Sequence, residues 1–242
     1  HKKEDDRSFI ILDKSPFYAE SGGQVSDEGE IIISDVKLQV VGLAKSNNHI
    51  IHIVDNSSDI VIYEGMEVTA AVDEKRRMDT MRNHSVTHFI HAALRKIVGS
   101  HIQQAGSYVG PDHLRFDFSH FAKLTNEEIA AIEKLVNEQL RRNLELAHHR
   151  NTPFEDAKKM GALMFFGDKY GDFVNVVQFG DFTLEFCGGT HVKNSSHIGL
   201  FKIVSESSIA SGIRRIEAVT GRGVEEYLNL QNEKLSKAEQ RI

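Results

Sequence analysis

Two short segments that lie far apart in the sequence carry side chains suited to one metal ion. His84 and His88 are four residues apart, and so are Cys187 and His191, which enclose Gly188-Gly189-Thr190. Together they offer three imidazoles and one thiolate, a ligand set that suits a tetrahedral zinc ion. If both pairs bind the same ion, the chain must fold so that the two segments meet. We therefore predict a Zn²⁺ site where they meet.

The first pair falls within a segment of helical periodicity. Apolar residues recur at about the 3.6-residue period from Asp73 to Gly99, where the glycine is expected to end the helix. On such a helix His84 and His88 project from one face about one turn apart. His91 lies on much the same face, so the helical spacing does not decide which two of the three histidines bind.

The regions around this helix contain many short strand patterns. Five runs of β-branched and apolar residues, separated by turn residues, predict a small β-barrel over residues 1–72 that carries a glycine-rich Ser21-Gly22-Gly23-Gln24 turn. Residues 73–220 are expected to form the zinc-containing core, in which helices cover an antiparallel sheet. Residues 221–242 have the pattern of the start of a longer helix or coiled coil. The predicted fold class is α+β.

A capping box predicts a second helix in this core. Thr125 and Glu128 have the spacing at which each side chain satisfies a free backbone N–H, and apolar periodicity continues to Leu144. The basic cluster expected near the end of this helix consists of Arg141, Arg142, His148, His149 and Arg150. Its charges favour the helix dipole, and its side chains are either solvated or in contact with phosphate.

Composition restricts the compartment and the partners. A chain of 242 residues that is 40% hydrophobic and 26% charged, without a run of about 18 apolar residues, is typical of a globular protein that crosses no membrane. The single cysteine cannot form an internal disulfide, and a free thiol is best kept reduced, so the cytoplasm is expected. The net charge of −6 means that an RNA partner would need local basic patches. The chain begins at His1 without a signal sequence, and we expect it to be part of a longer protein.

The residues beside the expected ligands restrict the chemistry. A zinc protease with this histidine spacing needs a glutamate directly after the first histidine, where this chain has Ser85. A papain-like role for Cys187 is also disfavoured, because two glycines follow it and no asparagine or aspartate is placed to orient a histidine. The ion is then either closed and structural, or shares one position with a substrate as a Lewis acid. Gly188 and Gly189 favour the second case, because they leave backbone N–H groups near the ion.

Six segments, in order, resemble the editing region of alanyl-tRNA synthetases and of the free-standing proteins related to it. They are Pro16–Gln24, Arg82–His88, Gln104–Ser107, Leu114–Phe118, Cys187–His191 and Ser211–Val219. The resemblance covers almost the whole chain. It implies a hydrolase that cleaves the ester joining serine or glycine to tRNA(Ala). We expect the aminoacylation and C-terminal regions of such a synthetase to lie outside this chain.

The resemblance also assigns roles to individual residues. The implied zinc ligands are His84, His88, Cys187 and His191. This leaves His91 as a packing residue or an outer contact. Gln104 matches a glutamine of the family's editing pocket, and the turn with Gly22 and Gly23 matches a loop near it that we expect to bind substrate. The catalytic candidates are Gln104, Cys187 and His84.

A separate editing site is physically reasonable. A pocket made for alanine cannot exclude glycine, and rejects an isostere with one added hydroxyl by only about 10²-fold. Polar groups that read the serine hydroxyl would reject alanine more strongly, and Thr87, Gln104 and Thr190 are unranked candidates. Zinc polarises the ester carbonyl, activates a water, or holds the amino group or a ribose hydroxyl. Because no acidic residue of the motifs is an evident base, a metal-bound or ribose-assisted water is our preferred hypothesis.

Two alternatives stay open. One is a non-catalytic tRNA-docking module whose zinc is structural. The other is the editing domain of threonyl-tRNA synthetases, which resembles this chain in both ligand pairs. The Ser21–Gln24 turn and the Arg214–Ala218 segment disfavour the second alternative.

Overall fold

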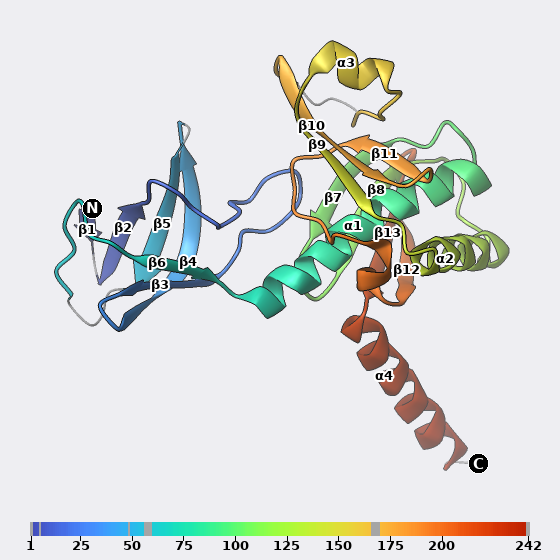
Figure 1. Ribbon diagram of the computed structural model, residues 1–242. Coiled ribbons are helices and arrows are strands. Elements are labelled where there is room, and N and C mark those ends of the chain that lie inside the picture. Colours follow the sequence, from blue (N-terminus) through green and yellow to red (C-terminus); the bar gives the residue numbers. More distant parts are fainter. Residues whose placement is uncertain (1, 5, 48, 56–59, 166–169, 241–242) are drawn as a thin grey trace. The chain divides into compact units, whose positions relative to one another are not determined.

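The computed structural model describes residues 2–4, 6–47, 49–55, 60–165 and 170–240 of the chain (Figure 1). Contacts divide the chain into two compact units, His1–Met78 and Asp79–Ile242, and the division falls within helix α1 (Glu74–Ile97). Each unit has its own hydrophobic core. The mixed α and β composition agrees with the fold class that the sequence predicts.

The first unit contains one antiparallel sheet of six strands. These strands are β1 (Lys2–Glu4), β2 (Arg7–Ile11), β3 (Gly29–Ile33), β4 (Val36–Ser46), β5 (His49–Asp55) and β6 (Thr69–Val72). Their order is β1-β2-β5-β4-β3-β6, and Ile31, Ile33 and Leu38 are among the residues of its core. Among the described residues no pairing joins the edge strands β1 and β6, so the predicted closed barrel is not confirmed.

The second unit contains two antiparallel sheets where the sequence predicted one. Its strands are β7 (Gln104–Val109), β8 (Leu114–Ser119), β9 (Leu146–Pro153), β10 (Phe173–Phe179), β11 (Thr183–Phe186), β12 (Phe201–Ala210) and β13 (Ile213–Thr220). One sheet has the order β12-β13-β8-β7 and the other β11-β10-β9. Its further helices are α2 (Asn126–Arg141), α3 (Phe154–Lys159), the short 3-10 helix η1 (Ser195–Ile198) and α4 (Arg222–Glu239).

Helix α1 lies between the two sheets of the second unit. The Phe89 ring lies 5.2 Å from that of Phe179 on the three-stranded sheet. The His91 ring lies 5.7 Å from that of Phe116 on the four-stranded sheet. Every residue from Asn83 to His91 is therefore buried, including the polar ones. Buried polar side chains need partners, so this helix has to be met by polar groups from both sides.

Helix α2 begins as the sequence predicts but ends earlier. Thr125 Oγ1 accepts the Glu128 N–H at 3.1 Å, and a Glu128 carboxylate oxygen accepts the Thr125 N–H at 2.8 Å, so the capping box is confirmed. The helix stops at Arg141 because Asn143 takes a left-handed conformation with φ 58°.

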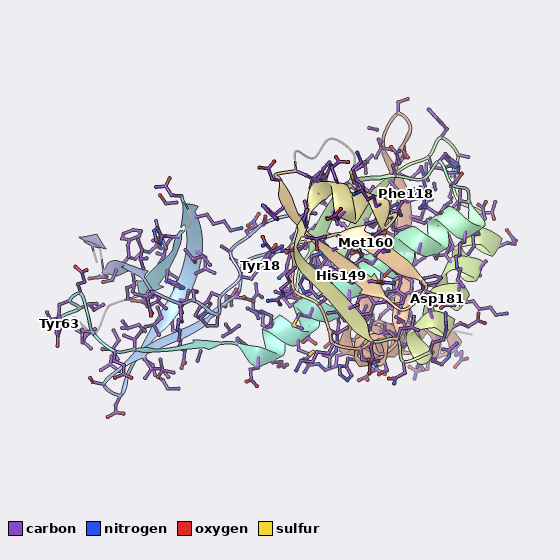
Figure 2. All side chains as sticks on the ribbon, turned by 45° about the horizontal axis from the view of Figure 1, so that its top comes forward. Tyr18, Tyr63, Phe118, His149, Met160 and Asp181 are labelled. Carbon is purple, nitrogen blue, oxygen red and sulfur yellow. The ribbon has the colours of Figure 1, made fainter. Side chains whose placement is uncertain are left out.

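The basic cluster expected on the face of α2 is therefore divided between two elements. His148, His149 and Arg150 lie on strand β9, where Figure 2 labels His149. The prediction that they lie on the helix was wrong. It arose because the sequence of this helix contains no glycine or proline that would mark its end.

The last element, α4, confirms that the C-terminal segment is helical, with Val224 buried and a largely exposed remainder. Among the described residues, no helix is both long enough and apolar enough to cross a membrane.

Candidate metal centre

The two residue pairs that the sequence singled out lie together in the second unit. The ligand-type atoms of His84, His88, Cys187 and His191 are all within 4.8 Å of one another. Cys187 Sγ is 3.4 Å from His84 Nε2 and 3.2 Å from His191 Nε2. Ligand atoms on a tetrahedral zinc ion are about 3.3–3.6 Å apart, given the usual Zn–N and Zn–S bond lengths. The four side chains thus match the size of a single zinc site.

Backbone contacts bring the second pair to the helix. Strand β11 ends at Phe186, and the Cys187 N–H donates to the Asn175 carbonyl at 3.0 Å. Beyond the glycines, the Val192 N–H donates to Ser85 Oγ at 3.0 Å. Ser85 Oγ also lies 3.2 Å from His191 Nδ1. Ser85, at the position where a zinc protease has its glutamate, therefore holds the loop from Cys187 to His191, the ligand loop, against α1.

A carboxylate that the sequence analysis did not select lies behind the cluster. Glu185 on β11 is 1% exposed and bonds His88 Nδ1 through one oxygen and His91 Nδ1, at 2.7 Å, through the other. The group of ligand-type atoms within 4.8 Å of one another does not include His91, which contacts the cluster through Glu185. The available signal was a charged residue within the apolar strand Thr183–Phe186, two positions before Cys187.

The donor set fits a metal ion. His88 is 1% exposed, and its Nε2 is buried without a hydrogen-bond partner among the described residues. Such a group is costly unless something binds it. Because Nδ1 is taken by Glu185, the free lone pair is on Nε2, as a metal-binding histidine requires. A cation is the group that this nitrogen and the neighbouring thiol both suit.

The electrostatics of the cluster favour the protonation states of ligands. Burial disfavours the Cys187 thiolate, but His84 and His191 outweigh it and hold the pKa of the thiol well below its ordinary value. Burial lowers the pKa of His191 to about 3, which keeps that imidazole neutral. A thiolate and a neutral imidazole are the forms that bind zinc.

His88 and Glu185 form a coupled buried pair. Burial opposes charge on both, but their attraction outweighs it, raising the pKa of His88 to about 10 and lowering that of Glu185 to about 2. A cation bound at Nε2 takes the place of one proton of His88, while the proton on Nδ1 stays on the bond to Glu185.

The other predicted site residues of this unit lie on three different elements. Thr87 is buried on α1, and its hydroxyl donates to the His84 carbonyl at 2.6 Å. Thr190 is half-buried in the ligand loop. Gln104 begins β7, and its register opposite Phe118 puts both on the sheet face that packs against α1. The side chain that would read a serine hydroxyl is not selected by these placements.

Gly22 and Gly23 belong to the first unit. They form the tip of a two-residue turn with φ values of 57° and 82°, closed by backbone bonds between Ser21 and Gln24. These left-handed conformations suit glycine and explain the paired glycines. The turn is anchored by Asp27, which accepts the Tyr18 N–H and the Arg77 guanidinium.

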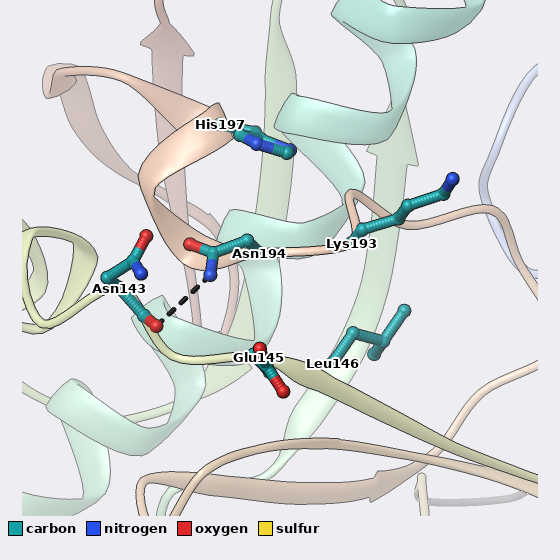
Figure 3. Close-up of a pocket in the computed structure, with 6 residues that line it drawn as sticks. All are labelled: Asn143, Glu145, Leu146, Lys193, Asn194 and His197. Atoms are coloured by element: carbon teal, nitrogen blue, oxygen red, sulfur yellow. Dashed lines mark hydrogen bonds between the residues drawn. The ribbon is translucent and has the colours of Figure 1, made fainter.

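A polar pocket of about 620 Å³ borders the ligand loop (Figure 3). It is lined by Asn143, Glu145, Leu146, Lys193, Asn194 and His197. Its wall is fixed by the bond from Asn194 Nδ2 to the Asn143 carbonyl at 3.1 Å and from the Leu146 N–H to the Lys193 carbonyl at 3.0 Å. The loop that carries His191 thus continues into a rigid connection with the end of α2.

Comparisons with known proteins show which proteins this chain is similar to. The family described as "Threonyl and Alanyl tRNA synthetase second additional domain" matches residues 174–217, and the family "tRNA synthetases class II (A)" matches residues 1–76. An alanine–tRNA ligase of Chlorobaculum tepidum is 48% identical over 93% of this chain. The corresponding ligase of Bacteroides fragilis is 49% identical over 94%, and that of Cytophaga hutchinsonii 47% over 96%. Over almost its whole length, the chain is therefore similar to one part of the alanine–tRNA ligases.

The match concerns one part of these ligases. The chain spans about a quarter of the length of its curated relatives, 27% of the Chlorobaculum ligase and 26% of the Bacteroides ligase. Residues 174–217, which match the family of threonyl and alanyl tRNA synthetases, contain Cys187 and His191.

Proposed function

We propose that this part of an alanine–tRNA ligase is an editing hydrolase that deacylates tRNA(Ala) carrying serine or glycine, with zinc bound by His84, His88, Cys187 and His191. The observation that carries the proposal is the meeting of these four side chains in one buried cluster, in a chain whose relatives are alanine–tRNA ligases. An alanine-specific ligase has a physical need for such a site, because its synthetic pocket cannot exclude glycine.

In the proposed reaction, water adds to the ester carbonyl carbon, the bond from that carbon to the ribose oxygen breaks, and the ribose oxygen takes up a proton. When bound, zinc supplies a Lewis acid for this chemistry. Ser85 and Glu185 hold His191 and His88 in the orientations that present Nε2. The side chains of this chain thus fix the site before the substrate arrives.

Access to the cluster is expected from one side. Cys187 is 8% exposed and His84 and His191 are each 6% exposed, whereas His88 is 1% exposed. The substrate ester therefore approaches the first three residues, and His88 is at the back. Gly188 follows Cys187, is exposed, and has no atom within 4 Å of the place where a Cβ would be. This exposed position beside Cys187 is where we expect the end of the tRNA to approach.

The general base is not expected to be a carboxylate of the cluster. Both oxygens of Glu185 are engaged by buried histidines, so it has no free position for a water proton. This supports a water assisted by the ribose. For recognition of serine, the Thr87 hydroxyl already donates its proton to the His84 carbonyl and can only accept a further bond. Thr87 therefore stays a proposed acceptor for the serine hydroxyl, beside Gln104 and Thr190.

A deacylation panel tests the proposal. The chain is incubated at micromolar concentration with Ser-tRNA(Ala), Gly-tRNA(Ala), Ala-tRNA(Ala) and Ser-tRNA(Thr). Selective hydrolysis of the first two is expected, and a Gln104→Ala variant is expected to lose activity while retaining bound zinc. Hydrolysis of Ser-tRNA(Thr) in preference to Ser-tRNA(Ala) would show a threonyl-type specificity instead.

A second candidate is a non-catalytic module that binds tRNA through a scaffold held by zinc. It is favoured by the completeness of the ligand set, because structural zinc sites have four protein ligands whereas catalytic sites keep one position open. Zinc-bound chain that binds tRNA(Ala) but leaves Ser-tRNA(Ala) intact would establish this alternative.

A further inference from the structure

One carboxylate links two buried histidines behind the proposed ligands. Glu185 bonds His88 through Oε2 and His91 through Oε1, and each of the three side chains is at most 3% exposed. None of the three is reached by bulk water, so their hydrogen bonds are not exchanged for solvent. The orientation of His88 is set by this network.

The charge of Glu185 matches that of the proposed metal site. A zinc ion brings two positive charges and the Cys187 thiolate one negative charge, which leaves one positive charge in a buried place. The Glu185 carboxylate brings the remaining negative charge. With zinc bound and the histidines neutral, the buried assembly is electroneutral, which avoids the cost of an uncompensated buried charge.

Glu185 also decides which nitrogen of His88 has a lone pair. A carboxylate only accepts, so His88 keeps its Nδ1–H on the bond to Glu185, and Nε2 is the nitrogen that can give up its proton to a metal ion. His88 Nε2 is the buried atom that has no partner among the described residues. Ser85 Oγ contacts His191 Nδ1, but a hydroxyl both donates and accepts, so it orients that ring without deciding its tautomer.

His91 acts on the same carboxylate. Its Nδ1 lies 2.7 Å from Glu185 Oε1, and its Nε2 is buried without a partner among the described residues. The bond to Glu185 is therefore the one polar contact that the structure gives this ring. A carboxylate held at both oxygens cannot rotate away from His88.

We propose that Glu185 and His91 are positioning residues that raise the zinc affinity of the site through His88, with His91 acting through Glu185. Neither residue is a ligand. The proposal rests on the metal site of the proposed function and not on its hydrolytic activity.

The first test compares two buried carboxylates. Glu185→Gln keeps the shape of the side chain but cannot accept a hydrogen bond at both ends. Glu206→Gln is the control, because the Glu206 side chain is 2% exposed and paired with Arg214, away from the cluster. Zinc affinity is measured by competition with a chromophoric chelator. Glu185→Gln is expected to weaken it by about 10- to 100-fold, the usual effect of losing such a partner, whereas Glu206→Gln leaves it unchanged.

The second test examines His91. His91→Leu removes the donor to Glu185, and His91→Gln replaces it by an amide N–H of similar reach. His91→Leu is expected to weaken zinc binding and His91→Gln to restore most of it. The double variant Glu185→Gln/His91→Leu is expected to bind zinc within about twofold of Glu185→Gln alone, since both residues act through one group. The Co²⁺ absorption of every variant should keep its thiolate band, because no ligand is lost.

Three results would overturn the inference. They are unchanged zinc affinity in Glu185→Gln, an equal loss in Glu206→Gln, or no difference between His91→Leu and His91→Gln. If Glu185→Gln does not fold, the His91 pair decides the question. Failure of the wild-type chain to bind zinc refutes the metal part of the proposed function, whereas normal wild-type binding with unaffected variants refutes this inference alone.

Discussion

The hydroxyl of Ser85 is the group through which the ligand loop is attached to α1, and its removal gives a quantitative prediction. Ser85 is fully buried, its Oγ accepts the Val192 N–H at 3.0 Å, and it lies 3.2 Å from His191 Nδ1. Ser85→Ala leaves the Val192 N–H and the His191 Nδ1 buried without this partner. The small space vacated by one hydroxyl does not admit a water.

The expected loss of stability follows from these two groups. Each buried polar group without a partner costs about 1–3 kcal/mol, so Ser85→Ala is expected to lower the free energy of unfolding by about 2–6 kcal/mol. The chain has no tryptophan, so unfolding in urea is followed by far-UV circular dichroism, with a chelator present. Zinc affinity is then measured separately and is expected to fall, because His191 loses its orienting contact.

Ser195→Ala provides the matched control. Ser195 is equally buried, and its Oγ accepts the Leu144 N–H at 2.8 Å without contacting a proposed ligand. It should lower stability by about 1–3 kcal/mol but leave zinc affinity unchanged. The reasoning fails if Ser85→Ala is within about 0.5 kcal/mol of the wild type, or if both serine variants change zinc affinity equally.

Four further predictions follow from the same structure. Cys187→Ala should abolish zinc binding and the deacylation of Ser-tRNA(Ala), as measured by metal analysis and release of labelled serine; unchanged values of both would show that the site is wrongly assigned. Asp27→Ala should lower the free energy of unfolding of the first unit, measured in urea, by about 3 kcal/mol, because it removes the buried acceptor of Tyr18 N–H and Arg77. Glu28→Ala, which removes an exposed partner of Arg76, should lower it by at most about 1 kcal/mol. Burial lowers the pKa of His52 in the folded chain. The stability contributed by its neutral ring is therefore complete above the unfolded-state pKa of about 6.5, and it is lost as the pH falls from there through the lower folded-state pKa. His52→Asn should lose less stability than the wild type between pH 7.5 and 5.5. Gly188→Ala should leave stability and zinc affinity unchanged, because its Cβ enters open space, but should slow deacylation if the substrate passes over the loop.

Sequence periodicity predicted α1 because its apolar residues repeat with the helical period. It could not predict that the helix is buried on every side from Asn83 to His91, since that depends on Phe89 and His91 meeting rings from distant strands. The division of the expected single sheet into two also depends on long-range pairing. The end of α2 was missed because Asn143, which takes the left-handed conformation, is less distinctive than glycine.

The proposed ligands were predictable because each pair has metal-ligand spacing within one local segment. Glu185 was not, because its partner His88 lies 97 positions away and a single glutamate in a strand is more often exposed. The role of His91 depended on Glu185 and could not be determined without it. Spacing therefore predicted the four residues that meet in the cluster, and only the fold shows that Glu185 and His91 lie behind them.

Removal of the metal cannot by itself distinguish a catalytic from a structural zinc. A cluster that joins α1 to the loop after β11 stabilises the folded chain when it binds an ion, in either case. Chelation would then abolish hydrolysis through loss of structure as well as through loss of chemistry. Gly188→Ala tests instead whether the substrate lies beside the cluster, as a catalytic zinc requires, because the position is exposed and its neighbours leave room for a methyl group. A variant with unchanged zinc content and unfolding free energy that no longer hydrolyses Ser-tRNA(Ala) would place the substrate at the exposed side of Cys187. If that variant keeps full activity, the substrate does not pass over this loop, and the proposed approach to the cluster is wrong.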